Sequence, residues 1–424
     1  MQRGSNRWRA RAAVSVLAAA CAVTTACSGA GGAGGAPGSQ PSHAASSATS
    51  AGADLPAPSP PAATSSGAPP SGTAPAGNAC VSQTLGRLTL AQQVGQLFMV
   101  GVAGDASTQQ LADAVRSYHF GSLLLTPSAA GTAALATQVT AMQSLAPSAT
   151  GGIGFFIAAN QEGGAVQQLT GPGFVAMPSA LTQGGWPPAT LRAAATQWGT
   201  DLRAAGVNLN LAPVMDVVPQ ATAAANAPIG ALNREFGFDP ATTGAHGVAF
   251  MQGMAAAGVM SVAKHFPGLG RVTGNTDFTS DVVDDVTTAS DPDLDSFRAA
   301  IDAGVPMVMV ALATYTKIDA SQLAVFSPVV MRLLRDGLGF TGVIVSDDLG
   351  EAKAVQAITV GDRALSFLAA GGDLVTSQNL GPAEQMAAAV LARASSDAAF
   401  RATVGAAATR VLAAKQTAGL LSCL

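Results

Sequence analysis

The chain has 424 residues, of which 48% are hydrophobic and 11% are charged, and its formal net charge is −4. This length allows one large domain or two ordinary ones. No run of basic residues marks a nucleic-acid footprint, so we expect no nucleic-acid partner. The sequence also lacks the CxxC and HxxxH spacings of metal sites, and we expect no metal and no cofactor.

Residues 1–27 are typical of a bacterial export signal. Arginines in the first eleven positions precede an apolar run at 12–23, which is too short to span a membrane. Small residues then lead to Cys27, which resembles the lipidated cysteine of a lipobox, with Cys21 as the competing position. We expect an exported protein held by a lipid at the outer face of the cell membrane. Ordinary cleavage without a lipid, giving a secreted protein, is the alternative.

Residues 28–79 consist mostly of Ala, Gly, Pro, Ser and Thr. Such a composition buries too little apolar surface to offset its ordering entropy, and it predicts a disordered tether. The folded domain is therefore expected at 80–424, bracketed by Cys80 and Cys423. These cysteines suggest a disulfide, worth about 4–5 kcal/mol in the chain-entropy model. Two unrelated buried thiols are the alternative.

Eight short apolar runs alternate with segments of helical length along the domain. The runs are continuously apolar rather than alternating, as expected for strands buried on both faces of a parallel sheet. We therefore predict an α/β fold with a single (β/α)8 barrel of the TIM type. An open doubly wound sheet is disfavoured because the loop at 101–104 lacks the glycine-rich phosphate fingerprint. The predicted strands are 97–102, 121–125, 153–159, 207–214, 259–263, 305–311, 342–345 and 372–376.

Ionisable residues follow several of these strands, at the end of the barrel where active sites form. Asn160 and Glu162 follow the third strand, Asp216 the fourth, Lys264 and His265 the fifth, and Asp347 and Asp348 the seventh. Carboxylates beside cations, with no phosphate cradle and no metal cluster, favour carbohydrate chemistry. Glycoside hydrolysis needs a pair of carboxyl groups, with cations and amides to hold sugar hydroxyls.

A series of ordered motifs from about residue 85 to 419 resembles glycoside hydrolase family 3, in its single-domain β-N-acetylglucosaminidase (β-hexosaminidase) branch. The leader and tether add a resemblance to actinobacterial lipoproteins of that branch. The resemblance implies a TIM-type barrel. The motifs are NQEGG at 160–164, LAPVMD at 211–216, NREFG at 233–237, KHFPG at 264–268, GVIVSDDL at 342–349 and AAGGD at 369–373.

The resemblance also implies the roles of the strand-end residues. Asp347 corresponds to the nucleophile of a retaining double displacement, and Asp348 supports it, although the two roles could be exchanged. Arg234, Lys264 and His265 fall where the family binds the N-acetyl sugar, and their N–H groups can donate to sugar oxygens. A satisfied structural histidine is the alternative for His265. Glu162 is expected to support this group.

The loop after the fifth strand departs from the family. The resemblance implies Asp-Ser-His there, with the histidine as acid/base, but Asn275, Thr276 and Asp277 occupy these positions. A carboxylic acid is an ordinary glycosidase acid/base once its pKa is raised. Asp277 is thus the candidate acid/base, with Asn275 supporting it. The nearby alternatives are Asp281, Asp284 and Asp285.

Two further departures lie after the third strand. Asn160 stands where the resemblance implies aspartate, and Ala165 and Gln168 replace cations. Asn160 and Gln168 remain candidate substrate-binding residues.

These observations predict an exo-acting, retaining β-N-acetylglucosaminidase. It would remove terminal β-GlcNAc from cell-wall or muropeptide-type sugars, as in peptidoglycan recycling, through a glycosyl-Asp intermediate. A family 3 hydrolase or phosphorylase of another β-sugar is one alternative, and a catalytically weakened sugar-binding lipoprotein is the other. We expect a small carbohydrate as substrate and a monomer in solution.

Overall fold

The computed structural model describes residues 76–102 and 109–422. The predicted signal, Cys27, most of the predicted tether and Cys423 lie outside the described residues. The predicted boundary at residue 80 falls within helix α1 (Ala76–Arg87), so the expectation of disorder up to residue 79 is wrong at its last four positions, 76–79, which are helical. Cys80 on this helix is disulfide-bonded. Its pairing with Cys423 stays a prediction.

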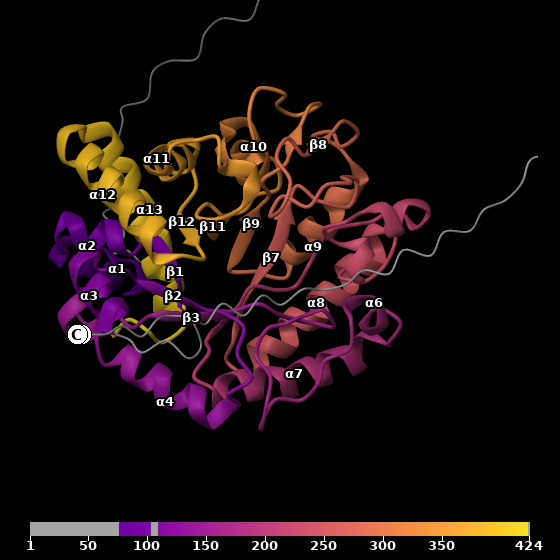
Figure 1. Cartoon of the computed structure of the whole chain (residues 1–424), viewed down its shortest axis with the longest axis horizontal. Coiled ribbons are helices and arrows are strands. Elements are labelled where there is room, and N and C mark those ends of the chain that lie inside the picture. The colour runs from indigo at the N-terminus through magenta and orange to yellow at the C-terminus, as the bar shows by residue number, and fades with distance from the viewer. Residues whose placement is uncertain (1–75, 103–108, 423–424) are drawn as a thin grey trace, which may run out of the picture. The chain divides into compact units, whose positions relative to one another are not determined.

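Eight parallel strands form a closed barrel, as the sequence predicted (Figure 1). The first strand pairs with both the second and the last, which closes the sheet. Each predicted apolar run overlaps one of the eight strands, and the strands at 260–266, 343–348 and 374–377 continue beyond the predicted ends. In chain order the strands are β1 (Phe98–Val102), β2 (Ser122–Leu125), β3 (Phe156–Ala159), β6 (Leu209–Asn210), β7 (Met260–Phe266), β9 (Met307–Val310), β11 (Val343–Asp348) and β12 (Leu374–Ser377).

Helices surround the barrel, and local sequence explains where several of them begin. Asp239 caps the helix that follows it by accepting from the backbone N–H of Thr242, and Pro240 occupies the first turn, where no N–H is needed. Thr89 and Gln92 form a capping box. The main helices are α2 (Leu90–Gly95), α3 (Gln109–Tyr118), α4 (Thr132–Gln143), α7 (Pro188–Ala204), α8 (Pro240–Ala256), α9 (Asp295–Asp302), α10 (Pro328–Arg332), α11 (Val360–Ala370), α12 (Leu380–Ser396) and α13 (Ala398–Thr417).

The described helices were also compared with the requirements of a membrane span. None of them is both long enough and apolar enough to cross a bilayer.

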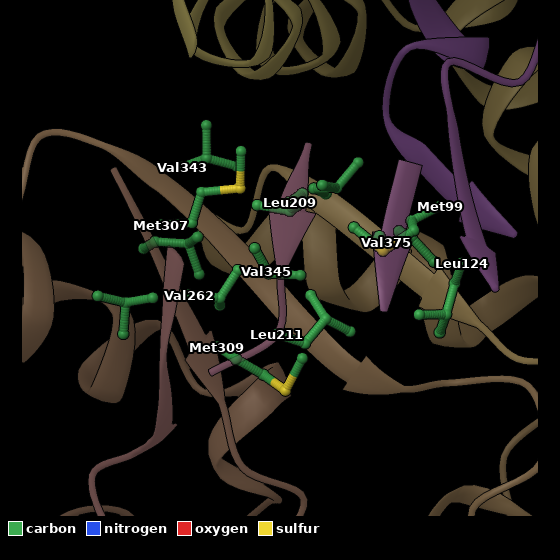
Figure 2. Packing of buried hydrophobic residues seen from close by; sticks show 14 of the residues in the cluster. Met99, Leu124, Leu209, Leu211, Val262, Met307, Met309, Val343, Val345 and Val375 are labelled. Atoms are coloured by element: carbon green, nitrogen blue, oxygen red, sulfur yellow. The ribbon is translucent and has the colours of Figure 1, made fainter. Parts of the chain in front are cut away.

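The hydrophobic core lies among the barrel strands and between them and the helices. Figure 2 shows buried side chains gathered around the strands, among them Leu211, Met309 and Leu124. These three side chains also line a pocket at one end of the barrel. The packed core therefore supplies an apolar floor for that pocket.

A buried lysine on α13 contacts the opposite, N-terminal end of the strands. Lys415 Nζ donates to Gln96 Oε1 at 2.7 Å and to the Gly121 carbonyl at 2.6 Å. Its ammonium lies 5.5 Å from the centre of the Phe156 ring. Burial lowers the pKa of Lys415 to about 7. No ion pair of Lys415 with a carboxylate is present in the described part of the chain.

Candidate active site

A polar pocket with a volume of about 240 Å³ opens at the end of the barrel where the strands carry their ionisable residues. Asp347 reaches it from the end of β11, and Lys264 and His265 reach it from the end of β7. All predicted catalytic and sugar-binding residues line this pocket. The full polar lining is Asn160, Gln168, Arg234, Lys264, His265, Asn275, Thr276, Asp277, Asp347, Asp348, Thr376 and Gln378.

Glu162 holds the two cations of the pocket. It lies on β4 (Gln161–Gly163), and its carboxylate accepts from Arg234 Nε and Nη2, both at 2.8 Å, and from Lys264 Nζ at 2.6 Å. Burial alone would raise the pKa of Glu162, but the charges of Arg234 and Lys264 outweigh it and lower the pKa to about 2. Glu162 is therefore ionised at neutral pH and fixes both cations in place.

Both cations keep N–H groups that can donate to a ligand. Lys264 also donates to Asn160 Oδ1 at 2.9 Å, and Arg234 Nη1 donates to the Pro228 carbonyl at 2.8 Å. Lysine has three donors and arginine has five, so Lys264 retains one and Arg234 retains two. The site thus presents oriented donors, while the Asn160 carbonyl oxygen is already engaged by Lys264.

His265 is oriented by Asp216, which follows β6. Asp216 Oδ2 accepts from His265 Nδ1 at 2.8 Å, and Oδ1 accepts from the backbone N–H groups of His265 and Leu269 at 3.1 and 2.8 Å. With Nδ1 donating to a fully buried carboxylate, Nε2 is left to meet a ligand in the pocket. The sequence placed Asp216 at a strand end but gave it no role. The signal in the sequence that could have indicated a role for Asp216 was its place as the last residue of the 211–216 motif.

The two adjacent aspartates at the end of β11 have different environments. Asp348 is buried, and its carboxylate accepts from the backbone N–H groups of Gly350, Gln378 and Glu351 at 2.9, 3.0 and 3.2 Å. Asp347 is half-buried, and among the described residues its carboxylate accepts only the N–H of Asp348, at 2.8 Å to Oδ1. The geometry therefore leaves Asp347 available for chemistry and gives Asp348 the supporting position.

A tight turn holds Asp277 at the mouth of the pocket. Asn275 Oδ1 accepts from the backbone N–H of Asp277 at 2.9 Å, and the Asn275 carbonyl accepts from Phe278 and Thr279 at 3.0 and 2.8 Å. Asn275 thus supports the loop backbone and makes no hydrogen bond to the Asp277 carboxyl group.

A second set of bonds joins this turn to the loop after β11. The backbone N–H of Lys353 donates to the Asp277 carbonyl, and that of Ala354 donates to the Thr276 carbonyl, both at 3.1 Å. The loop that carries Asp277 and the loop that follows Asp347 are therefore fixed to each other through main-chain atoms.

The surroundings of Asp277 raise its pKa to about 6. Removal of water by the neighbouring loops is the largest cause, although the residue as a whole is exposed, and the negative charge of Asp347 is the second. Asp348 acts in the same direction, and His265 and Arg234 oppose it. A carboxyl group with this pKa can be protonated near neutral pH, as a general acid requires.

The alternative aspartates lie in less suitable places. Asp284 is buried and accepts from the N–H groups of Val286 and Thr287 and from the Thr287 hydroxyl at 2.7–2.8 Å. Asp281 and Asp285 are exposed and do not line the pocket.

Sequence reasoning missed several pocket residues, among them two polar ones and two apolar ones that bear on the chemistry. Thr376 lies near the end of the eighth strand and Gln378 directly follows that strand. In this region the sequence indicated only Asp373 as an ionisable residue near the strand. Leu232 and Phe278 are apolar and gave no chemical signal. Among the described residues, no cluster of three or more His, Cys, Asp or Glu side chains is arranged to hold a metal ion.

Comparisons with known proteins agree with this architecture. The family model described as "Glycosyl hydrolase family 3 N terminal domain" matches residues 89–414. A β-hexosaminidase of Xanthomonas campestris is 32% identical over 296 residues, covering 66% of this chain and 83% of that protein. The β-hexosaminidase LpqI of Mycobacterium tuberculosis is 32% identical over 305 residues, covering 68% and 72%.

A solved structure extends the similarity to three dimensions. The crystal structure of a β-N-acetylhexosaminidase from Beutenbergia cavernae has a TM-score of 0.76 and 51% identity, covering 78% of this chain and 99% of that one. The match of the family model spans most of the barrel domain, and the relatives share both its sequence and its fold. The chain therefore belongs to glycosyl hydrolase family 3, and it is a glycoside hydrolase of the β-hexosaminidase type.

Proposed function

We propose that the protein is an exo-acting, retaining β-N-acetylglucosaminidase in which Asp347 is the nucleophile and Asp277 is the acid/base. One observation carries the assignment of the pair. Asp347 is a half-buried carboxylate with few partners, and its charge helps to raise the pKa of Asp277, across the same pocket, to about 6. Two carboxyl groups that line one pocket, one of them with a raised pKa, are what a double displacement needs.

The reaction then proceeds in two steps. A carboxylate oxygen of Asp347 forms a bond to the anomeric carbon while the glycosidic C–O bond breaks, and Asp277 gives its proton to the departing oxygen. Asp277, now ionised, takes a proton from water as the water oxygen bonds to the anomeric carbon. The bond to Asp347 breaks in this second step, and the sugar leaves with its β configuration.

Exo action is supported by the size of the pocket. Its volume of about 240 Å³ lies below the 300–1,000 Å³ of sites for drug-sized ligands, and Leu124, Leu211 and Met309 line its floor. Such a pocket holds about one sugar ring. The remaining donors of Lys264 and Arg234, together with the His265 ring and the Gln168 amide, are placed to bind the hydroxyl and N-acetyl oxygens of that ring.

Cell-wall fragments ending in β-GlcNAc are the proposed natural source of substrate. The support is the export signal predicted at residues 1–27 and the lipid anchor predicted at Cys27, which would place the enzyme beside the wall. Labelling cells with a radioactive fatty acid tests the anchor: wild type should carry the label and Cys27→Ser should not. Size-exclusion chromatography with light scattering tests the proposed monomer.

The chemistry is tested by trapping the intermediate. The full chain is incubated with a 2-deoxy-2-fluoro glycoside analogue bearing an activated leaving group, and the labelled peptide is identified by mass spectrometry. We expect the label on Asp347, and we expect NMR to show the β anomer as the first product of an aryl β-N-acetylglucosaminide. A label on Asp348, or an α anomer, would contradict the proposal.

Two further outcomes separate the alternatives. Binding of GlcNAc without turnover of any substrate would identify a sugar-binding protein. Formation of GlcNAc 1-phosphate in phosphate buffer would identify a phosphorylase.

A further inference from the structure

Phe278 combines a strongly exposed aromatic ring with a position at the active site. Phe278 as a whole is 81% exposed, which is the highest exposed fraction among the large hydrophobic residues in the described part of the chain. Phe278 nevertheless lines the pocket. Leu232, which is 37% exposed, lines it as well and comes from a different segment, the last residue of the 3-10 helix Gly230–Leu232. Apolar surface that stays in water beside a binding site marks a place where a ligand docks.

The backbone beneath Phe278 is held firmly. Its N–H donates to the Asn275 carbonyl at 3.0 Å, and the neighbouring Asp277 and Thr276 carbonyls accept from Lys353 and Ala354 at 3.1 Å. The ring is therefore displayed by an ordered turn. A ring that is already positioned can be covered by a ligand at little further cost in conformational entropy.

The ring lies on the leaving-group side of the pocket. Asp277 gives its proton to the departing oxygen, so that oxygen must lie within hydrogen-bond reach of Asp277, and Phe278 is the next residue. Asp347 attacks from the opposite side of the anomeric carbon. A group attached to the departing oxygen consequently passes Phe278 as it leaves the mouth of the pocket.

We propose that Phe278, together with Leu232, forms the binding site for the leaving group, and that a pyranose ring bound there rests its apolar C–H face on the aromatic ring. The inference rests on the proposed function and refines it. Among β-GlcNAc glycosides, Phe278 therefore contributes to kcat/KM where the leaving group carries a second sugar ring, and not where it carries none.

The test compares leaving groups with and without a ring in the full chain. Phe278→Ala should lower kcat/KM about tenfold for N,N′-diacetylchitobiose, because burial of a phenyl ring is worth at least that factor. For N-acetyl-β-glucosaminyl fluoride, whose leaving group has no ring, kcat/KM should stay within about twofold of wild type. Phe278→Tyr should restore the chitobiose rate, and Val283→Ala, at an exposed valine outside the pocket, should change neither.

Each outcome has a distinct meaning. Equal losses for chitobiose and the fluoride, or no loss for either, would overturn the role of Phe278. Failure of the wild-type protein to hydrolyse the fluoride or an aryl glycoside would refute the proposed function itself.

Discussion

Asp216 accepts two hydrogen bonds from His265, one from its backbone N–H at 3.1 Å and one from its ring Nδ1 at 2.8 Å. One buried carboxylate thus fixes both the main chain and the ring of the histidine. The tautomer with Nδ1 protonated leaves Nε2 facing the pocket, in the manner of an aspartate that orients a catalytic imidazole.

Asp216→Asn should disturb this orientation. The amide oxygen can still accept from a backbone N–H, but the amide nitrogen cannot accept from Nδ1, so the ring turns or changes tautomer. We expect kcat/KM for an aryl β-N-acetylglucosaminide to fall about 10–100-fold, with a circular dichroism spectrum like that of wild type. Unchanged kinetics would mean that His265 needs no orienting partner.

Glu162→Gln should destabilise the fold as well as the site. The substitution keeps the shape of the side chain but leaves Arg234 and Lys264 buried beside a neutral amide, which we expect to cost about 3–5 kcal/mol in the free energy of unfolding. Urea titration measures this loss. The matched control is Glu351→Gln at an exposed glutamate, which should change stability by less than about 0.5 kcal/mol.

Asp277 should control the alkaline side of the pH profile. Because its pKa is raised to about 6, it is protonated below that pH and ionised above it, so kcat/KM should fall as pH rises through about 6. Asp277→Asn should abolish this limb. It should also slow a substrate with a poor leaving group about 10²–10⁴-fold, and an activated dinitrophenyl substrate far less. Asp285→Asn is the control and should keep the fall of kcat/KM with rising pH. If Asp277→Asn also keeps this fall, Asp277 is not the acid.

Lys415 should make stability depend on pH above neutrality. Its pKa is about 7 in the folded protein and about 10.5 when the chain is unfolded, so between these values the unfolded state binds the extra proton. The free energy of unfolding should therefore rise with pH over this window, by at most about 1.4 kcal/mol per unit. Denaturant titrations of wild type and Lys415→Met at pH 7 and 9 measure the difference, and parallel curves would contradict the lowered pKa.

The fold could be predicted because its signal is distributed along the chain. Each barrel strand overlaps an apolar run, and helix α8 begins where the sequence supplies both a capping aspartate and Pro240. Strand ends were less certain. Residues 207–214 were predicted as one strand, but regular pairing is confined to Leu209–Asn210, with only an isolated bridge between Val214 and Lys264 beyond it. Pro213 has no backbone N–H to donate, so the ladder of hydrogen bonds is interrupted at this residue.

The candidate site could be predicted only in part, because its partners are distant in sequence. Residue type identified Lys264 and Arg234 as cations, but it could not show that Glu162 compensates both of them. That arrangement depends on bringing together segments 72 and more residues apart. Phe278 was missed for a different reason: an aromatic residue in a loop has no chemical signature until its exposure is known.

The main-chain bonds from Lys353 to Asp277 and from Ala354 to Thr276 have a consequence for how such enzymes diversify. Since these bonds use no side-chain atoms, the position of the loop does not depend on which residue supplies the proton. A different side chain can therefore stand at residue 277 while the loop keeps its position relative to the residues after β11. If residue 277 supplies the proton as proposed, a substitution there is expected to change the working pH range of the enzyme without moving its scaffold.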